Sequence, residues 1–344
     1  MRDPGAGVSR SYRLDVPAPW HGAGLFDFFA QRAVPGVESA TEYPAGRLYR
    51  RAVRLAHGHG LVSVSWPPAI GLEPVDGRQT GPSSPAGPPF VLAPVAVGVD
   101  TIVADGRDHD EALALARRLF DLDAVPEPID AHLAADPVLA PLVARRPGVR
   151  VPGTADAHEL VVRAIIGQQV SVVGARTIAG RLAERYGQPV EVTDPSGSLH
   201  RQFPSAGTLA GLEPQALPMP RARGGALIGA CRALAEGDVV IGPGADPEQV
   251  HRALVSLPGI GPWTADYVIL RCLDYRDVFL PTDLAIRHAL ARLGLEDRRQ
   301  AQLAADGWRP WRSYATLHLW LSLGDQPASS TADTASGSTS TSLS

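Results

Sequence analysis

The chain has 344 residues, 44% of them hydrophobic, which is enough to bury two or three hydrophobic cores. No apolar run approaches the length of a membrane span, and the N-terminus lacks the apolar segment of a signal peptide, so we expect a soluble, cytoplasmic protein without a membrane partner. The formal net charge is −4, and the 32 basic residues include no lysine, which excludes chemistry that needs a lysine amine.

The first third of the chain contains strand-like and helix-like segments. Apolar and polar residues alternate as in strands over residues 11–19, 48–55, 61–66 and 97–103. Apolar residues recur at helical spacing over residues 24–34 and 108–122. We therefore expect an α+β domain over residues 11–123, preceded by a disordered segment over residues 1–10. Residues 74–93 are rich in Pro, Gly and Ser, which predicts a flexible insertion in that domain.

Beyond residue 124 the alternation ends and helical patterns follow one another. They cover residues 137–145, 157–170, 172–186, 223–236, 247–257, 262–273, 283–293, 297–305 and 310–322. We expect an all-α region over residues 124–324. Residues 325–344 are rich in Ser, Thr and Ala, which predicts a disordered tail.

A tight turn joins two of these helices, in the run Leu257-Pro258-Gly259-Ile260-Gly261-Pro262-Trp263-Thr264. Gly259 and Gly261 permit positive φ and a close approach of another backbone. Pro262 suits the first turn of the second helix. The amides of Gly259, Gly261 and Thr264 would lie at a helix N-terminus, which favours an anion such as a DNA phosphate. Such contacts position a duplex without reading its sequence. An ordinary helix connection with a glycine cap fits the short pattern as well.

Asp283 stands at the end of the segment Val278-Phe279-Leu280-Pro281-Thr282, directly before an amphipathic helix. One interpretation is that Asp283 only caps this helix, because Asp is a common N-cap residue. A helix N-terminus also stabilises a charged carboxylate, so a cap and a catalytic group can be the same residue. A fixed anion in a water-poor site stabilises the positive charge that develops on a sugar when an N-glycosidic bond breaks, and it can orient or deprotonate the attacking water.

The hairpin and the aspartate together resemble the signature of the helix-hairpin-helix, Gly/Pro-Asp superfamily of DNA glycosylases. Separated matches over residues 11 to about 324 resemble its DNA-3-methyladenine glycosylase II family. They include Phe28-Phe29-Ala30-Gln31-Arg32-Ala33-Val34, Val162-Arg163-Ala164-Ile165-Ile166-Gly167-Gln168 and Leu317-His318-Leu319-Trp320. The resemblance implies a small N-terminal antiparallel-sheet domain with helices, followed by an all-α helix-hairpin-helix glycosylase region.

Carried over position by position, the resemblance places the catalytic carboxylate on Asp283 and an aromatic base pocket on Trp263, Tyr267, Trp320 and Phe28. Alkylated purines such as 3-methyladenine carry a positive charge, which an aromatic face attracts by about 0.5–2 kcal/mol. The same charge weakens the glycosidic bond, so the base needs little help in leaving. Alternatively the aromatic residues belong to the core, since Trp320 shares a helical face with Leu317 and Tyr314.

Two positions depart from the family pattern. Gln169 stands where the best-known member inserts an apolar wedge into the duplex, and Leu284 stands where a pocket aromatic is expected after the aspartate. Both substitutions affect which damaged bases the enzyme is expected to accept. The resemblance also implies a monovalent cation held by the backbone carbonyls of Val255, Leu257 and Ile260, and no required cofactor.

Relatives that also cleave the DNA strand use a lysine two residues after the second hairpin glycine, as an amine nucleophile that forms a Schiff base. Trp263 occupies that position here. Cys231 and Cys272 are too few for the four-cysteine cluster of several relatives or for a cysteine-rich zinc site, and we expect them to be buried packing residues. These features predict a hydrolytic enzyme that leaves an abasic site.

The charge distribution is uneven. A net charge of −4 is unfavourable for DNA binding, because affinity depends largely on neutralising phosphates. Arginines, however, are concentrated in residues 201–232 and 287–312, whereas acidic residues crowd residues 100–123. This predicts a local basic face, although an arginine-rich helix surface in solvent is the other interpretation.

The sequence thus predicts a monomeric cytoplasmic enzyme, acting at the nucleoid, that flips alkylated bases such as 3-methyladenine and 7-methylguanine out of double-stranded DNA and hydrolyses their glycosidic bonds. The alternative is a non-catalytic helix-hairpin-helix protein that binds DNA lesions or junctions. Asp283 and the aromatic pocket distinguish the two, because a pure binder needs only the hairpin. A lyase-type glycosylase is disfavoured by the absence of lysine.

Overall fold

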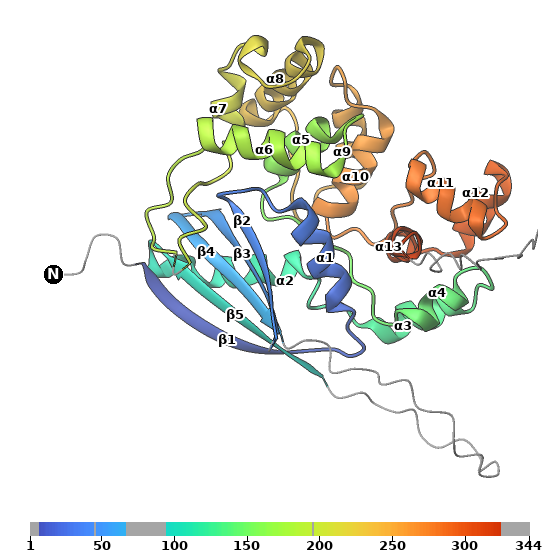
Figure 1. The fold of residues 1–344 in the computed structure, drawn as a ribbon. Coiled ribbons are helices and arrows are strands. Elements are labelled where there is room, and N and C mark those ends of the chain that lie inside the picture. The colour runs from blue at the N-terminus through green and yellow to red at the C-terminus, as the bar shows by residue number, and fades with distance from the viewer. Residues whose placement is uncertain (1–6, 45, 67–93, 195, 325–344) are drawn as a thin grey trace, which may run out of the picture.

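The computed structural model describes residues 7–44, 46–66, 94–194 and 196–324, and the statements below concern these ranges. The predicted insertion at 74–93 and the predicted tail at 325–344 lie outside them. A sheet domain comes first along the chain and a larger helical region follows it (Figure 1). In these ranges no helix is long and apolar enough to cross a membrane.

One antiparallel sheet of five strands, in the order β1-β5-β4-β3-β2, forms the N-terminal domain. The strands are β1 (Val8–Val16), β2 (Glu38–Tyr43), β3 (Gly46–Leu55), β4 (Gly58–Trp66) and β5 (Val95–Val103). β1 pairs with β5 from Val8 onward, so residues 8–10 belong to the sheet rather than to the disordered segment that the sequence predicts. β2 is missed by the sequence pattern because its residues, ESATEY, are mostly polar; it is an edge strand that pairs with β3.

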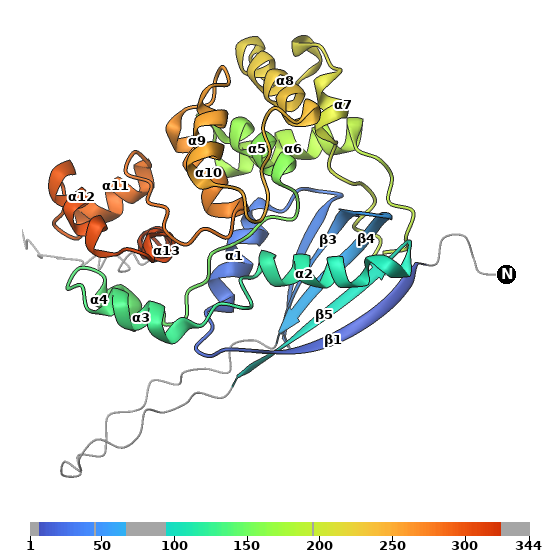
Figure 2. The same ribbon diagram turned by 180° about the vertical axis from the view of Figure 1, so that it is seen from behind.

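Two helices, α1 (Gly22–Arg32) and α2 (His109–Leu119), share one hydrophobic core with the sheet, and Figure 2 shows α2 lying across it. A short 3-10 turn, η1 (Gly106–Asp108), leads into α2. The centre of this core is aromatic: the ring centroids of Phe29, Tyr49 and Phe120 lie 4.9–5.6 Å apart. Such ring pairs add stability beyond the burial of their area. Phe28, beside Phe29 on α1, is thereby held at the edge of this core, toward the helical region.

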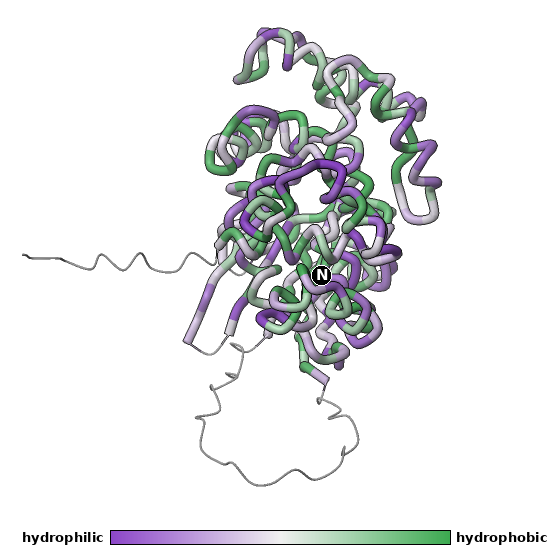
Figure 3. The backbone as a smooth tube through the Cα atoms, turned by 90° about the vertical axis from the view of Figure 1, so that its right-hand side faces the viewer, coloured by the Kyte–Doolittle hydropathy of each residue, from purple (hydrophilic) through white to green (hydrophobic). Residues whose placement is uncertain are grey.

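The helical region contains all the remaining helices, which share a second core. They are α3 (Pro126–Ala134), α4 (Ala140–Arg145), α5 (Ala157–Gly167), α6 (Val172–Tyr186), α7 (Ala206–Ala210), the 3-10 turn η2 (Pro214–Ala216), α8 (Arg221–Glu236), α9 (Pro247–Val255), α10 (Pro262–Cys272), α11 (Leu284–Arg292), α12 (Arg298–Gly307) and α13 (Arg312–Ser322). Hydrophobic and hydrophilic residues alternate in short stretches along the tube of Figure 3, as the packing of one helical face requires.

Two of these helices are missing from the sequence prediction. α3 opens with Pro-Glu-Pro, which is typical of loops as much as of a first helical turn. α7 has only five residues, too few for a helical periodicity to be recognised.

Three buried charged residues and the partly buried Arg163 join the sheet domain to α5. Arg51 donates to Glu159 at 2.8 Å and to Glu38 at 3.2 Å, and Arg163 donates to Glu38 at 3.0 Å and to Glu159 at 2.8 Å. Burial raises the pKa of Glu38, but the charges of Arg163 and Arg51 and hydrogen bonds from Tyr49 and the backbone outweigh it, so the net pKa is lowered. Because each carboxylate faces two guanidiniums, the cost of burying the charges is offset. The network fixes α5, whose C-terminal end reaches the cleft described below.

Candidate active site

The predicted hairpin lies between α9 and α10. Asp246 accepts a hydrogen bond from the Gln249 amide at 2.8 Å and caps α9, and the Ile260 amide donates to Leu257 O at 3.1 Å to close the turn. Gly259 has φ +84°, and a Cβ at this position would lie 2.6 Å from the Ala226 Cβ on α8. Only glycine therefore fits this position without displacing α8.

The amides of Gly259 and Gly261 donate to no atom within the described ranges, so both remain available to an anion. The Thr264 amide instead donates to Gly261 O at 3.0 Å, inside the first turn of α10. The Thr264 amide is thus less available to an anion than the other two, and its role in phosphate binding stays a prediction. Of the three predicted amides, those of Gly259 and Gly261 are therefore the ones without an acceptor in the described part of the chain.

Asp283 caps α11 and belongs to an aromatic cleft at the same time. Its Oδ1 accepts from the Ile286 amide at 2.9 Å and from Trp320 Nε1 at 3.2 Å, while its Oδ2 accepts from Trp263 Nε1 at 2.8 Å. Three N–H donors and a helix N-terminus stabilise the negative charge. The interpretation of Asp283 as a helix cap is confirmed, and the cap leaves the carboxylate within the cleft. The carboxylate has no ion-pair partner among the described residues, so its charge remains uncompensated by a guanidinium.

The position of Asp283 relative to Trp320 is fixed by α13. Ser313 Oγ accepts from the Val278 amide at 3.0 Å, and Thr316 Oγ1 donates to Val278 O at 3.3 Å. Arg312 Nε donates to Asp277 Oδ1 at 2.6 Å. These bonds hold the segment that leads to Asp283 against the helix that carries Trp320, so the carboxylate and the indole are placed by one rigid unit.

Three of the predicted pocket aromatics adjoin one another. Trp263 and Tyr267, one turn apart on α10, have nearly parallel rings (7°) with centroids 5.5 Å apart, and Tyr267 meets Trp320 at 6.4 Å and 60°. Together with Phe28 and Asp283 they line a cavity of about 880 Å³ between α1, α10 and α13. Tyr314 of the same helix is fully buried in the core, whereas Trp320 packs against the core and is only partly buried, so one of its sides faces the cavity.

Phe28 has a different environment from the other three aromatics. The Cζ atom of Arg32 lies 4.0 Å from its ring centroid, and that of Arg271 lies 4.7 Å away. The ring thus already receives two cations from the protein, which makes it a poor receptor for the charge of a base. Sequence reasoning missed both arginines. Each stands four residues after an aromatic, Phe28 or Tyr267, and this spacing on one helical face was the available signal.

Arg271 lies at the wall of the cavity and is 7% exposed. Its Nη1 donates to the Tyr267 hydroxyl at 2.8 Å, its Nη2 donates to Gly153 O at 2.5 Å, and its Nε donates to Pro152 O. Burial raises the pKa of Tyr267, but Arg271, Arg32 and Arg163 and the hydrogen bond from Arg271 outweigh it, so the pKa of this phenol is below its ordinary value.

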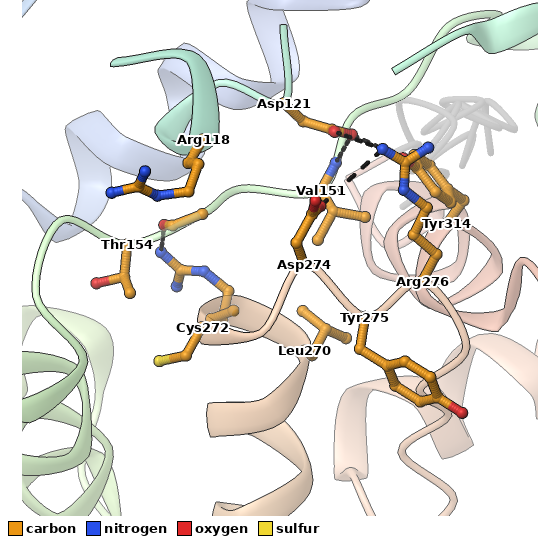
Figure 4. Close-up of a pocket in the computed structure, with 12 residues that line it drawn as sticks. Arg118, Asp121, Val151, Thr154, Leu270, Cys272, Asp274, Tyr275, Arg276 and Tyr314 are labelled. Carbon is orange, nitrogen blue, oxygen red and sulfur yellow. Dashed lines mark hydrogen bonds and ion pairs between the residues drawn. The ribbon is translucent and has the colours of Figure 1, made fainter. Parts of the chain in front are cut away.

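Arg271 also lines a second, much smaller cavity of about 40 Å³, and Figure 4 shows a close-up of this cavity. Asp121 faces it with a left-handed backbone (φ +48°) and accepts from the Tyr314 hydroxyl at 2.8 Å and from the Val151 amide at 3.2 Å. Burial raises the pKa of Asp121 to about 6, although Tyr314, Arg276, Arg150 and the Val151 amide act in the opposite direction. The contacts tie the end of the sheet domain to α13, and the cavity holds space for little more than water.

The loop after α5 carries the predicted wedge. Gln169 is exposed and has a left-handed backbone with φ +58°, which directs it away from the helix. Gln168 was not predicted to act, yet its Nε2 donates to Gly259 O at 3.0 Å and to Thr264 Oγ1 at 3.2 Å. This residue therefore ties the wedge loop to the hairpin. Leu284, the other departure from the family pattern, is 64% exposed beside Asp283.

The arginines of the predicted basic face divide into two groups. Arg309 and Arg312 both bind Asp277 at 2.6 Å, so their charges are largely compensated. The exposed arginines of the two predicted segments that have no ion pair in the described part of the chain are Arg221 and Arg232 on α8 and Arg287, Arg292, Arg298 and Arg299 on α11 and α12. The basic face is thus narrower than the sequence suggests.

Side chains offer no metal centre: the described ranges contain no group of three His, Cys, Asp or Glu residues that could hold one. Cys231 is fully buried and Cys272 partly buried, and burial raises the pKa of each thiol to about 12. Both are inert as nucleophiles. The backbone carbonyls of Val255, Leu257 and Ile260 lie at the hairpin, and Leu257 O already accepts from the Ile260 amide.

Comparison with known proteins adds an independent line of information. A family model described as AlkA N-terminal domain matches residues 11–73 and 93–156. DNA-3-methyladenine glycosylase 2 of Escherichia coli (strain K12) is 34% identical over 319 residues, which cover 92% of this chain and 99% of that protein. A Mycobacterium tuberculosis protein, "Probable bifunctional transcriptional activator/DNA repair enzyme AlkA", is 40% identical over 314 residues. The matched part is 91% of this chain but 57% of that relative, so the chain spans little more than half of its length.

Solved structures share the fold. A 3-methyladenine DNA-glycosylase from Archaeoglobus fulgidus superposes with a TM-score of 0.68 at 19% identity, over 90% of this chain and 97% of that one. An 8-oxoguanine glycosylase/lyase from Clostridium acetobutylicum gives a TM-score of 0.57 at 14% identity, over 84% and 98%.

Proposed function

The chain belongs to the DNA-3-methyladenine glycosylase 2 family, and on that premise we propose that it is a monofunctional glycosylase that removes alkylated bases from duplex DNA. It hydrolyses the N-glycosidic bond of bases such as 3-methyladenine and 7-methylguanine and leaves an abasic site for base excision repair. One observation carries the proposal: a carboxylate without an ion-pair partner, Asp283, is held by two indole N–H groups in an aromatic cavity of about 880 Å³.

The geometry suits a reaction in which positive charge appears on the sugar. As the bond to the base lengthens, the sugar acquires oxocarbenium character, and a fixed anion beside it stabilises this charge in the transition state. Trp263 and Trp320 hold the carboxylate from two sides, so little reorganisation is needed when the charge develops. The same carboxylate can orient the water that attacks C1′.

The aromatic residues suit the bound base. Trp263, Tyr267 and Trp320 present π faces and edges around a space large enough for a flipped nucleotide. A cationic alkylated purine gains cation–π attraction of about 0.5–2 kcal/mol from such faces, which an undamaged neutral base does not. Phe28 supports this wall from the sheet domain, but its ring is engaged by Arg32 and Arg271.

The DNA contacts are proposed from the hairpin and the wedge loop. The amides of Gly259 and Gly261 bind a backbone phosphate, and Gln169 enters the gap left by the flipped base and hydrogen-bonds its former partner. Because the site is complete within one chain, we propose a monomer. The substrate is genomic DNA, and we therefore place the protein at the nucleoid in the cytoplasm.

No cofactor takes part in the proposed hydrolysis. A monovalent cation at the carbonyls of Val255, Leu257 and Ile260 would strengthen the hairpin for phosphate binding, since it adds positive charge near the free amides. Among the described residues Leu257 O accepts from the Ile260 amide, and this bond leaves a second lone pair on that oxygen.

Methylated duplex DNA and the variant Asp283→Asn test the proposal. We expect the wild type to release free 3-methyladenine and leave heat-labile abasic sites, and the variant to bind the same DNA but release the base at least 100-fold more slowly, because its amide carries no charge. Since no lysine is available, borohydride should trap no protein–DNA adduct. Equal binding without release by either protein would establish the non-catalytic lesion-binding alternative instead.

A further inference from the structure

The hydroxyl of Tyr267, a partly buried residue, is arranged differently from those of two fully buried tyrosines. Tyr49 donates to Glu38 at 2.7 Å, and Tyr314 donates to Asp121 at 2.8 Å, so both protons are committed to carboxylates. The Tyr267 oxygen instead accepts from Arg271 Nη1 at 2.8 Å, and its own proton has no acceptor in the described part of the protein. Because Tyr267 lines the large cavity, this proton is available to a molecule bound there.

Arg271 holds this arrangement at a considerable cost in buried charge. The guanidinium has no carboxylate partner among the described residues; the Pro152 and Gly153 carbonyls, the Tyr267 oxygen and the Phe28 ring hold it. A charge-assisted hydrogen bond to a phenol oxygen draws electron density from its O–H bond and makes the hydroxyl a stronger donor. If Arg271 only held Tyr267 in place, a neutral donor at residue 271 would serve as well.

The surroundings of Tyr267 contain donors and positive charge. The charged groups that face it are Arg271 from α10, Arg32 from α1 and Arg163 from α5. Arg32 donates only to Phe28 O, at 3.2 Å, and has no carboxylate partner in the described ranges. The guanidinium groups of this wall can only donate, so a base that offers an amino group gains no hydrogen bond from them. A base that offers a ring nitrogen or a carbonyl oxygen would complete the hydrogen bond.

We propose that the Tyr267 hydroxyl, backed by Arg271, donates a hydrogen bond to an acceptor atom of the flipped base and thereby assists the departure of neutral bases. This inference rests on the proposed glycosylase function and adds a catalytic residue to it. A cationic alkylated purine leaves as a neutral molecule and needs little assistance, whereas a neutral base such as hypoxanthine leaves with negative charge. The donor stabilises that charge.

The reaction balances without any further reagent. The C1′–N9 bond breaks with its electron pair going to the base, and water adds to C1′ as a hydroxyl group and loses one proton. A neutral base such as hypoxanthine leaves as an anion and gains one proton in exchange, whereas a cationic base leaves neutral and the proton from water passes to solvent. The Tyr267 hydroxyl shares its proton with the leaving base and keeps it at the end of the turnover, so the enzyme needs no reprotonation step.

The variant Tyr267→Phe tests the proposal, because it keeps the aromatic ring and removes only the hydroxyl. Single-turnover rates are measured with excess enzyme on two duplexes that differ in one base, hypoxanthine in one and 7-methylguanine in the other. We expect the variant to release hypoxanthine at least 10-fold more slowly than the wild type and to release 7-methylguanine within threefold of it. Tyr314→Phe is the matched control: it removes a hydroxyl that points to Asp121, and both rates should change equally.

The pH profile provides a readout that a purely structural hydroxyl would not affect. The wild-type hypoxanthine rate should fall at alkaline pH as Tyr267 loses its proton, the 7-methylguanine rate should show no such fall, and the variant should show none for either base. Equal slowing of both bases by Tyr267→Phe, no slowing of either, or no hypoxanthine release by a wild type that releases 7-methylguanine overturns the proposal. A wild type that releases neither base refutes the proposed function itself.

Discussion

Gly259 and Gly261 share one hairpin but differ in what a side chain would meet, and this difference gives a quantitative prediction. Gly259 has φ +84°, and an added Cβ would lie 2.6 Å from Ala226 Cβ, whereas an added Cβ at Gly261 meets nothing within 4 Å. Gly261 also has an extended backbone, with φ −94° and ψ 172°, that any residue adopts. The two substitutions Gly259→Ala and Gly261→Ala therefore separate strain in the protein from obstruction of a phosphate.

The magnitude for Gly259→Ala follows from two contributions. A left-handed backbone costs a non-glycine residue about 1–2 kcal/mol, and overpacking against α8 adds about 1–3 kcal/mol. We expect the free energy of unfolding to fall by about 2–5 kcal/mol. Gly261→Ala should change it by less than about 1 kcal/mol, with a small gain possible because alanine restricts the unfolded chain.

Urea unfolding followed by circular dichroism measures these values, and fluorescence anisotropy with a duplex that contains an abasic-site analogue measures binding. Gly261→Ala should retain its stability but weaken binding at least 5-fold, because its methyl group stands where the phosphate approaches the amide. Equal stability of the two variants would refute the strain argument. Full DNA affinity of Gly261→Ala would refute the assignment of this amide to a phosphate.

Two further predictions concern the supports of the site. The pKa of Asp121 is about 6 in the folded protein and 3.8 in the unfolded chain, so the folded state binds this proton more tightly. Protonation of Asp121 therefore stabilises the fold at low pH, and this contribution is lost as the pH rises through 6. Between pH 4.5 and 7.5 the wild type should lose about 2 kcal/mol of stability relative to Asp121→Asn in parallel urea titrations, and a difference that does not change with pH would contradict the raised pKa. Gln168→Ala removes the hydrogen bonds to Gly259 O and Thr264 Oγ1. We expect the excision rate to fall about 10-fold and the free energy of unfolding to fall by no more than about 1–2 kcal/mol. An unchanged excision rate would show that the wedge loop does not depend on the hairpin.

Local patterns in the sequence determine the elements that carry the site. The proline–glycine run ends α9 and opens α10, the spacing of Trp263 and Tyr267 places both rings on one face of α10, and Asp283 before an amphipathic segment becomes its cap. These features depend on residues within a few positions of one another, where helix geometry alone relates one side chain to the next. The absence of lysine is likewise fixed by the sequence, and no tertiary arrangement can supply that amine.

Contacts between distant segments were decided only by the tertiary structure. Trp320 donates to Asp283, 37 positions away in the sequence, and Gln168 donates to Gly259 O, 91 positions away. Arg32, which belongs to the sheet domain, lies close enough to Tyr267 in the helical region to lower the pKa of its hydroxyl. The polar strand β2 pairs with β3, and its first residue, Glu38, receives hydrogen bonds from Arg51 and from Arg163 on α5. Helical periodicity states which face of an element is buried, but not which element it meets, because packing energies depend on partners that the chain brings together only when it folds.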